Sequence, residues 1–138
     1  NKYTVLFHGK ELKQHSLGQR ASALMMFILS QKRHDVILID QPEDDLDNQT
    51  IYEDVIKMIA ELKLKVQFIV ATHNANIPVL GNAEQIHACR FTEPAFSSTS
   101  GSIDRPELQK MVVDIMEGGQ EAFNRRNEIY SRWKPALA

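Results

Sequence analysis

Cysteine is nearly absent from this sequence, because Cys89 is the only one among 138 residues. An intrachain disulfide is therefore excluded. No early apolar stretch is long enough for a signal peptide, and none reaches the roughly 20 residues of a membrane span. A strong excess of basic residues is also missing, since the formal net charge is −2, so any contact with DNA has to be local. These absences favour the cytoplasm and no membrane partner.

The composition that remains is that of a folded domain. Hydrophobic residues make up 43% of the chain and charged residues 25%, which is typical of globular proteins rather than of disordered ones. A chain of this length can bury about two thirds of its unfolded surface. We therefore expect one domain over residues 1–138 with a hydrophobic core.

Two short apolar runs are separated by a helical segment. Val36–Ile39 and Val66–Thr72 are rich in β-branched residues and predict strands, the first of them buried on both faces. Between them, Thr50 and Glu53 form a capping-box pattern at the start of a helix that ends near Leu64. A crossover of this length joins parallel strands. We expect an α/β fold with a mainly parallel sheet flanked by helices.

The other elements are predicted from apolar periodicity and from turn residues. Met25, Met26 and Phe27 are expected in the core. The predicted elements are a helix over 19–31, a third strand over 84–90, a Ser/Thr/Gly-rich loop over 97–102, a helix from Pro106 to Glu117, and a last helix over 120–133 that follows Gly118–Gly119.

An acidic loop directly follows the first predicted strand, and Asp40 stands at the strand's carboxyl end. In open α/β sheets this edge is where ligands bind. A carboxylate there can hold the water shell of Mg²⁺, because this hard cation takes oxygen ligands and keeps several waters. The alternative is a buried strand followed by a solvated turn.

Two further segments contain candidates for phosphate contacts. Ser16 and Gly18 stand at the start of a predicted helix, where a hydroxyl and unpaired backbone N–H groups favour an anion. An ordinary helix cap explains the same residues. His73 follows the second strand, so parallel pairing predicts that it shares a sheet edge with Asp40. A loop histidine that caps a neighbouring group is the alternative.

Taken together, these segments resemble the motifs of ABC-type ATPase heads, and of SMC/RecF-like heads most of all. The resemblance covers about residues 3 to 90 and keeps the order of the family's motifs. Ser16-Leu17-Gly18-Gln19 is similar to the signature motif Leu-Ser-Gly-Gly-Gln, with His15 at the usual leucine and Leu17 at the first glycine. Val36–Asp40 resembles the Walker B strand, Pro42 stands at the proline that follows it, and Leu46 and Asp47 match the Leu-Asp of the D-loop. His73 resembles the switch histidine.

The resemblance implies ATP and Mg²⁺ as cofactors, with hydrolysis by in-line attack of water on the γ-phosphate. In such heads two copies sandwich ATP, and the stretch Ser16, Leu17, Gly18 and Gln19 of one copy covers the γ-phosphate bound to the other. Asp40 would position Mg²⁺ through its water, His73 would sense the γ-phosphate, and Asp47 would communicate across the dimer. The family further implies DNA repair, maintenance or defence.

Gln41 departs from the family, which has its catalytic glutamate at this position. A glutamate can accept a proton from the attacking water, whereas an amide can only orient the water by hydrogen bonds. Some GTPases do position water with a glutamine, and Glu43 is close enough in sequence to turn toward the γ-phosphate. We expect a slow ATPase with a long-lived bound state.

A phosphate loop of the form Gly-x-x-x-x-Gly-Lys-Ser/Thr does not occur in the 138 residues. Such a loop supplies the backbone donors and the lysine that hold the β- and γ-phosphates. In the family it belongs to the amino-terminal lobe, so the resemblance implies a carboxy-terminal lobe, with residues 118–138 as its terminal helix. The expected partner is a Walker A-bearing segment or chain, without which the lobe should be inactive.

Two other classes of function remain open. One is a Toprim-like metal-dependent nuclease in which Glu43, Asp45 and Asp47 chelate two divalent ions. It needs a second acidic cluster that the sequence does not supply. The other is a non-hydrolysing interaction domain of an ATPase assembly, which Gln41 and the missing phosphate loop both favour.

Overall fold

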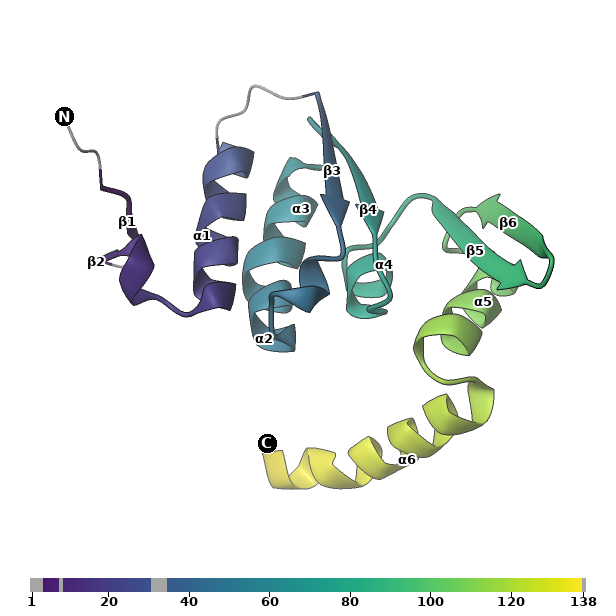
Figure 1. Ribbon diagram of the computed structural model, residues 1–138. Coiled ribbons are helices and arrows are strands. Elements are labelled where there is room, and N and C mark those ends of the chain that lie inside the picture. The colour runs from purple at the N-terminus through teal and green to yellow at the C-terminus, as the bar shows by residue number, and fades with distance from the viewer. Residues whose placement is uncertain (1–3, 8, 31–34, 138) are drawn as a thin grey trace. The chain divides into compact units, whose positions relative to one another are not determined.

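The computed structural model describes residues 4–7, 9–30 and 35–137 (Figure 1). Its internal contacts divide the chain into two compact units, residues 1–72 and 73–138, and each unit is described by itself. The expectation of one domain over 1–138 stays a prediction. None of the described helices is long and apolar enough to span a membrane.

The first unit begins with small elements that lead into a long helix. The strands β1 (Leu6–Phe7) and β2 (Lys10–Glu11) pair antiparallel around Gly9, whose φ of +76° suits a residue without a side chain. A short 3-10 turn, η1 (Leu12–Gln14), and then α1 (Leu17–Ser30) follow. Gln31, where the predicted helix ends, lies outside the described residues.

A parallel pair of strands forms the centre of the first unit. β3 (Val36–Asp40) and β4 (Gln67–Ala71) run in register, and the predicted strand–helix–strand crossover is confirmed. The crossover contains a 3-10 turn and one continuous helix. In chain order its parts are η2 (Pro42–Asp44), α2 (Asn48–Thr50), the π-helical turn η3 (Ile51–Ile56) and α3 (Lys57–Leu62).

The crossover helix starts earlier than the sequence pattern predicts. Asp47 is its N-cap, and the Asp47 carboxylate accepts a hydrogen bond of 2.9 Å from the backbone N–H of Thr50. Thr50 itself has a helical φ of −60°. The prediction of Thr50 as the cap is therefore wrong. Aspartate is among the best N-cap residues, and it is available three positions upstream.

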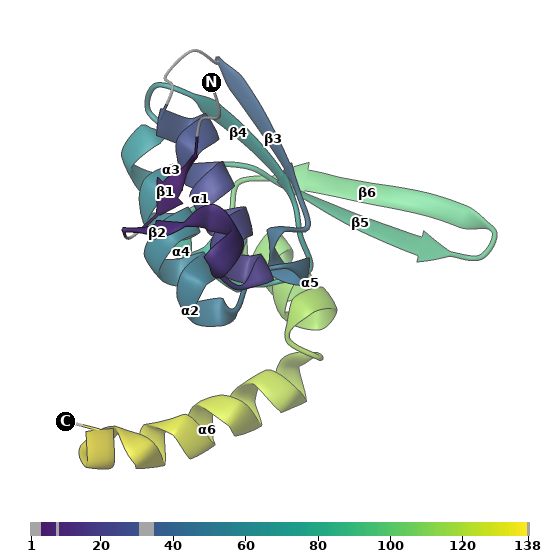
Figure 2. The same ribbon diagram turned by 60° about the vertical axis from the view of Figure 1, so that its left-hand side comes forward.

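Helices cover one face of the β3–β4 pair. Figure 2 shows α1 and α3 on the same side of these two strands. Alternate residues of both strands are half-buried, whereas Val36, Leu38 and Ile69 are exposed by 44%, 75% and 49%. The prediction of a strand buried on both faces is wrong, because successive side chains point to opposite faces and the described residues supply a layer for only one of them.

The core of the first unit lies between α1 and the crossover helix. Ile51 and Val55 are fully buried, and Ala23 of α1 is 7% exposed. Helical spacing places these residues on facing sides of two helices that pack against each other. Phe27 was expected in the core, but it is 56% exposed although it stands one helical turn after Ala23.

The second unit contains a β-hairpin and three helices. Its elements are α4 (Asn76–Leu80), β5 (Ile86–Thr92), β6 (Ala95–Gly101), α5 (Pro106–Met116) and α6 (Gln120–Leu137). The predicted third strand is confirmed, shifted by two residues. The predicted loop over 97–102 is wrong for 97–101, because pairing with β5 satisfies the backbone of this Ser-rich segment, and strand pairing outweighs weak propensity.

The helices at the end of the second unit agree closely with the prediction from the sequence. Pro106 occupies the first turn of α5, as predicted. Gly118 and Gly119 have φ values of +80° and +90°, which turn the chain into α6. Arg126 of α6 then forms a 2.8 Å ion pair with Glu117. Ala138, the last residue of the predicted terminal helix, lies outside the described residues.

The sheet organisation differs from the prediction. The described residues form three two-stranded sheets, of which only β3–β4 is parallel. Among the described residues, helix is more abundant than strand. The α/β class is therefore present, but a mainly parallel sheet is not confirmed by the described residues, where the hairpins β1–β2 and β5–β6 pair antiparallel with sequence neighbours.

Candidate functional site

Asp40 lies at the tip of the parallel pair, as the sequence predicts. Its side chain is exposed, and its partner in the register is Ala71, the last residue of β4. The backbone N–H of Gln41 donates a 2.8 Å hydrogen bond to the Ala71 carbonyl, which extends the pairing by one residue. The carboxylate of Asp40 is thus held on a rigid strand end.

Gln41 adopts a left-handed backbone conformation, with φ 43° and ψ 60°. This conformation reverses the chain from β3 into η2, where the ring of Pro42 is buried. For a residue with a Cβ it costs roughly 1–2 kcal/mol. Strained residues of this kind cluster at functional sites, and here the strain falls on the residue that stands where ABC-type heads, which the motifs resemble, have a glutamate.

Replacing Gln41 by glycine is expected to raise the free energy of unfolding by about 0.5–1 kcal/mol, because relief of the left-handed strain exceeds the added entropy of the unfolded chain. Urea denaturation of the parent and of Gln41→Gly measures the difference. Gln41→Ala is the control, since it keeps the Cβ and therefore the strain. An equal gain in Gln41→Ala would show that backbone strain is not the cause.

Glu43 brings a second carboxylate to the same edge. Thr72, the residue after β4, donates a 2.6 Å hydrogen bond from its hydroxyl to Oε1 of Glu43, and both residues are half-buried. The sequence singled out Glu43 but not its contact with Thr72. A hydroxyl directly before His73 at a strand end was the available signal, but which acceptor it meets depends on how the crossover folds back.

Ser16 caps helix α1 and does so in a reciprocal capping box. The Ser16 hydroxyl oxygen accepts a 3.2 Å hydrogen bond from the Gln19 backbone N–H, and Oε1 of Gln19 accepts one of 3.2 Å from the Ser16 N–H. Leu17 and Gly18 form the first turn of the helix. The helix-cap explanation is therefore realised in the structure, with Ser16 and Gln19 exposed.

His15 ties the amino-terminal hairpin to this cap. Its Nε2 lies 2.8 Å from the carbonyl oxygen of Phe7, and the two rings meet edge to face with centroids 5.4 Å apart. Nδ1 lies 3.2 Å from Oε1 of Gln19. Sequence reasoning noted His15 only as a departure from the signature motif. The structure indicates that it orders the approach to α1.

Asp47 is occupied by its role as a cap. One carboxylate oxygen accepts from the Thr50 N–H at 2.9 Å and the other from the Thr50 hydroxyl at 3.0 Å. The backbone N–H of Thr50, followed by its hydroxyl, lowers the pKa of Asp47 below the ordinary 3.8, because both favour the charged form. The residue is exposed at the surface.

A lowered pKa means that Asp47 stabilises the fold above pH 3.8 and that this contribution is lost as the pH falls through the folded-state pKa. We expect the urea midpoint of the parent to fall more steeply than that of Asp47→Asn below about pH 4. Asp45→Asn, which removes an exposed carboxylate from the same loop, is the control. Parallel pH profiles for the parent and Asp47→Asn would contradict this.

His73 is the second residue after Ala71 and the first residue of the second unit, and its side chain is exposed. Two of the three carboxylates of the nuclease alternative have separate partners, Glu43 in Thr72 and Asp47 in Thr50. Among residues 4–7, 9–30 and 35–137, no three His, Cys, Asp or Glu side chains gather as metal ligands. The nuclease alternative stays a prediction.

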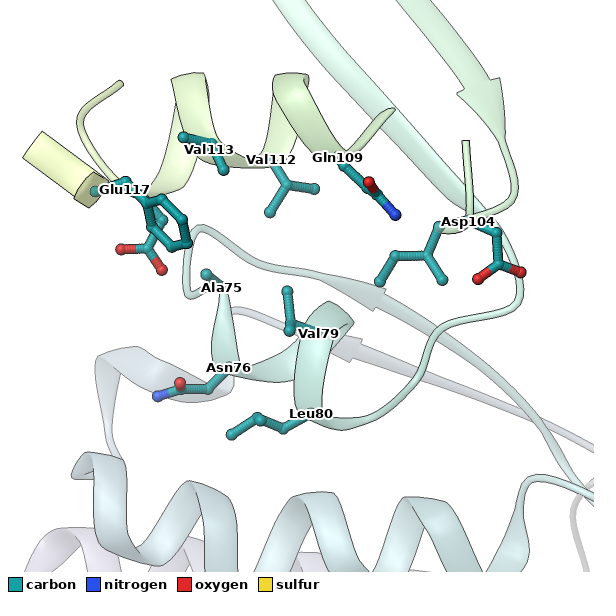
Figure 3. Close-up of a pocket in the computed structure, with 11 residues that line it drawn as sticks. Ala75, Asn76, Val79, Leu80, Asp104, Gln109, Val112, Val113 and Glu117 are labelled. Atoms are coloured by element: carbon teal, nitrogen blue, oxygen red, sulfur yellow. The ribbon is translucent and has the colours of Figure 1, made fainter. Parts of the chain in front are cut away.

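A pocket of about 400 Å³ lies within the second unit (Figure 3). Val79 of α4 and Val112 of α5 face each other across it, and Phe123 of α6 also belongs to its lining. Its lining is mostly apolar, and none of the residues predicted for the site belongs to it.

Comparison with protein families and with curated proteins finds no match. The similar solved structures include the following two. One, from work on ATP-driven dimerization and DNA-stimulated activation of SMC ATPases, has a TM-score of 0.56 and 22% identity and covers 71% of this chain and 61% of that one. The other, an SmcHead bound to the C-winged helix domain of ScpA, has a TM-score of 0.59 and 23% identity and covers 69% and 29%.

The chain thus spans less than two thirds of either structure it matches. At this identity the likeness establishes the fold, which is the α/β fold found in SMC ATPase heads. The resemblance seen in the motifs and the similarity of the fold come from different observations, and they agree.

Proposed function

We propose that this chain is the carboxy-terminal lobe of an SMC/RecF-like ABC ATPase head, which binds and hydrolyses ATP once a Walker A-bearing segment completes it. The observation that carries the proposal is the tip of the β3–β4 pair. There Asp40 stands on a strand end in register with β4, and Thr72 holds Glu43 at the same edge. The similarity of the fold to SMC heads supports it.

Asp40 is the residue that would hold Mg²⁺, through a water. An exposed carboxylate on a fixed strand end fits a hard cation that keeps much of its hydration shell. Bound Mg²⁺ supplies charge neutralisation between the β- and γ-phosphates of ATP. The chain's part is to orient the ion's water shell, which the rigid pairing of β3 with β4 does.

Gln41 and Glu43 both act on the attacking water, with different roles. The Gln41 amide orients the water by a hydrogen bond, and the Glu43 carboxylate accepts its proton as the oxygen attacks phosphorus and the bond to ADP breaks. His73 donates a hydrogen bond to the γ-phosphate and so distinguishes ATP from ADP. Because Glu43 is half-buried and already bonded to Thr72, proton transfer is slow and the bound state is long-lived.

Assembly completes the site. Two heads pair with ATP between them, so that the stretch Ser16, Leu17, Gly18 and Gln19 of one head covers the γ-phosphate of the other, and Asp47 contacts the partner head. The work on similar heads concerns ATP-driven dimerization and stimulation by DNA. We place the assembly in the cytoplasm, in DNA repair, maintenance or defence.

The exposed face of β3–β4 is where the Walker A-bearing segment packs. Val36, Leu38 and Ile69 form an apolar surface on a sheet of two strands. Apolar residues gathered on one face mark an interaction site, and strands with open edges accept further strands. A lobe that supplies strands and an apolar layer would cover this surface.

The test is ATP binding by the chain alone and by the completed head. The isolated chain is expected to show no micromolar affinity, since it lacks the loop that holds the β- and γ-phosphates. Addition of the Walker A-bearing segment should create both binding and phosphate release. Equilibrium titration with a fluorescent ATP analogue measures the first and a phosphate assay the second. Micromolar affinity of the chain alone would contradict the proposed division of the site.

Gln41 specifically favours a second candidate, a head that pairs on ATP without hydrolysing it. An amide at the position of the catalytic glutamate cannot accept a proton. In that case the completed head dimerises with ATP and releases no phosphate, and Gln41→Glu creates turnover. If the parent already releases phosphate, the first proposal holds.

A further inference from the structure

Ser22 is a buried polar residue of the first unit. It lies in α1 with only 2% of its surface exposed, and its hydroxyl donates a 2.6 Å hydrogen bond to Oδ2 of Asp54 in η3. A buried hydroxyl needs a partner, and a bond to a carboxylate is among the stronger ones. Apolar contacts between α1 and η3 tolerate sliding, whereas this bond has a direction and a length. It therefore fixes how the two helices meet.

Each residue of this bond lies in a helix that begins at one of the two segments proposed to contact nucleotide, the Ser16–Gln19 stretch and the acidic loop. Ser22 follows the Ser16 cap within the same helix, and Asp54 follows the Asp47 cap within the crossover helix. Both caps are closed, the first by the Ser16–Gln19 capping box and the second by the Asp47–Thr50 bonds. The Ser22–Asp54 bond thus fixes the spacing between the Ser16–Gln19 stretch and the acidic loop.

The carboxylate belongs to a π-helical turn, which is a second unusual feature at the same place. Such turns are rare, and they occur mainly as insertions at functional sites. A wider turn changes which residues of the crossover helix face α1. Ile51 and Val55 still face the core here, and Asp54 lies between them in sequence, where its carboxylate reaches Ser22.

We propose that Ser22 and Asp54 are positioning residues, which hold the Ser16–Gln19 stretch and the acidic loop at the spacing that a paired head requires. This inference rests on the proposed function. In a symmetric pair, one loop of each lobe serves its own nucleotide and the other serves the nucleotide of the partner, so both must fit at once. An error in their spacing then disturbs both sites.

Hydrogen exchange on the chain itself is the first test. Ser22→Ala is expected to speed amide exchange in 16–20 and 51–56 by about tenfold, the factor that corresponds to losing a hydrogen bond to a charged group. Exchange in β4 should change far less. Ile59→Val is the matched control, because it shortens a buried side chain of α3 and keeps both bond partners. If Ser22→Ala instead speeds exchange uniformly along the chain, as expected of the control, the bond contributes only to overall stability and the proposal is overturned.

Turnover by the completed head is the second test. Per folded molecule, Ser22→Ala and Asp54→Ala should each lower kcat by about tenfold and leave the KM for ATP within about twofold, since spacing affects a step made only in the pair. The double variant should be no slower than either single variant, because both remove the same bond. Asp54→Asn keeps an acceptor oxygen and should retain most of the activity.

The outcomes separate the two proposals. If the parent head neither binds nor hydrolyses ATP while Ser22→Ala still loosens 16–20 and 51–56 selectively, the proposed function fails and the structural coupling stands. If the parent hydrolyses ATP and Ser22→Ala keeps the parent kcat, the positioning role fails and the proposed function stands. A kcat loss in Ile59→Val as large as that in Ser22→Ala also rejects the positioning role.

Discussion

ATP turnover by the completed head is expected to fall by about 10²–10³-fold when Asp40 is replaced by asparagine, the loss typical of removing one preorganised electrostatic group. Asparagine has nearly the same shape but lacks the charge that orients the water shell of Mg²⁺. Because Asp40 is exposed at a strand tip, the fold should not change. Steady-state phosphate release measures the effect, and thermal unfolding checks the fold.

Asp45→Asn is the matched control for this substitution. It removes an exposed carboxylate of the same acidic loop that is not on the strand tip, and turnover should stay within about twofold of the parent, as expected for a surface charge. If Asp40→Asn keeps the turnover of the parent while the head still binds ATP, Asp40 is not the Walker B aspartate. Equal losses in the two variants would point to the net charge of the loop.

Leu38→Lys is expected to weaken association with the Walker A-bearing segment by more than about 100-fold, because burying an unpaired ammonium costs several kcal/mol. Leu38 stands in the middle of the exposed face of β3 and is 75% exposed. The unfolding midpoint of the isolated chain should therefore stay unchanged. Isothermal titration of the two components measures the association.

Leu64→Lys provides the comparison, since Leu64 follows α3 and is 90% exposed outside the strand pair. The same change of side chain there should leave association unaffected. If both variants bind like the parent, the β3–β4 face is not the surface that the segment covers. If both bind weakly, added positive charge rather than position is the cause.

The β3–β4 pair shows which strands local sequence patterns can predict. Strands over Val36–Ile39 and Val66–Thr72 were predicted from β-branched runs and from the length of the crossover, both of which are properties of continuous sequence, and β3 and β4 form there. The β6 strand could not be predicted in this way. Residues Ala95–Gly101 have the composition of a loop, and they become a strand because β5 offers a complete set of backbone partners.

The residues of the candidate site also differ in whether a local pattern predicts their position. Asp40 and Ser16 could be placed at a strand tip and at a helix start, because those positions depend on the element that contains them. Thr72 and Glu43 come from opposite ends of the crossover, and no local pattern pairs them. The cap at Asp47 was missed for a different reason, because two good caps compete within four residues and only the folded helix shows which one is used.

The sequence by itself determined which chemistry is available: a carboxylate at the end of an apolar strand, a capped helix with a serine, and an amide where the heads that the motifs resemble have an acid. Only the tertiary structure decided how these groups are connected, through Thr72 to Glu43 and through Ser22 to Asp54. The physical reason is the separation along the sequence over which each interaction acts. Propensity and capping act within one turn or one strand, whereas a hydrogen bond between distant segments forms only after packing has brought its two ends together.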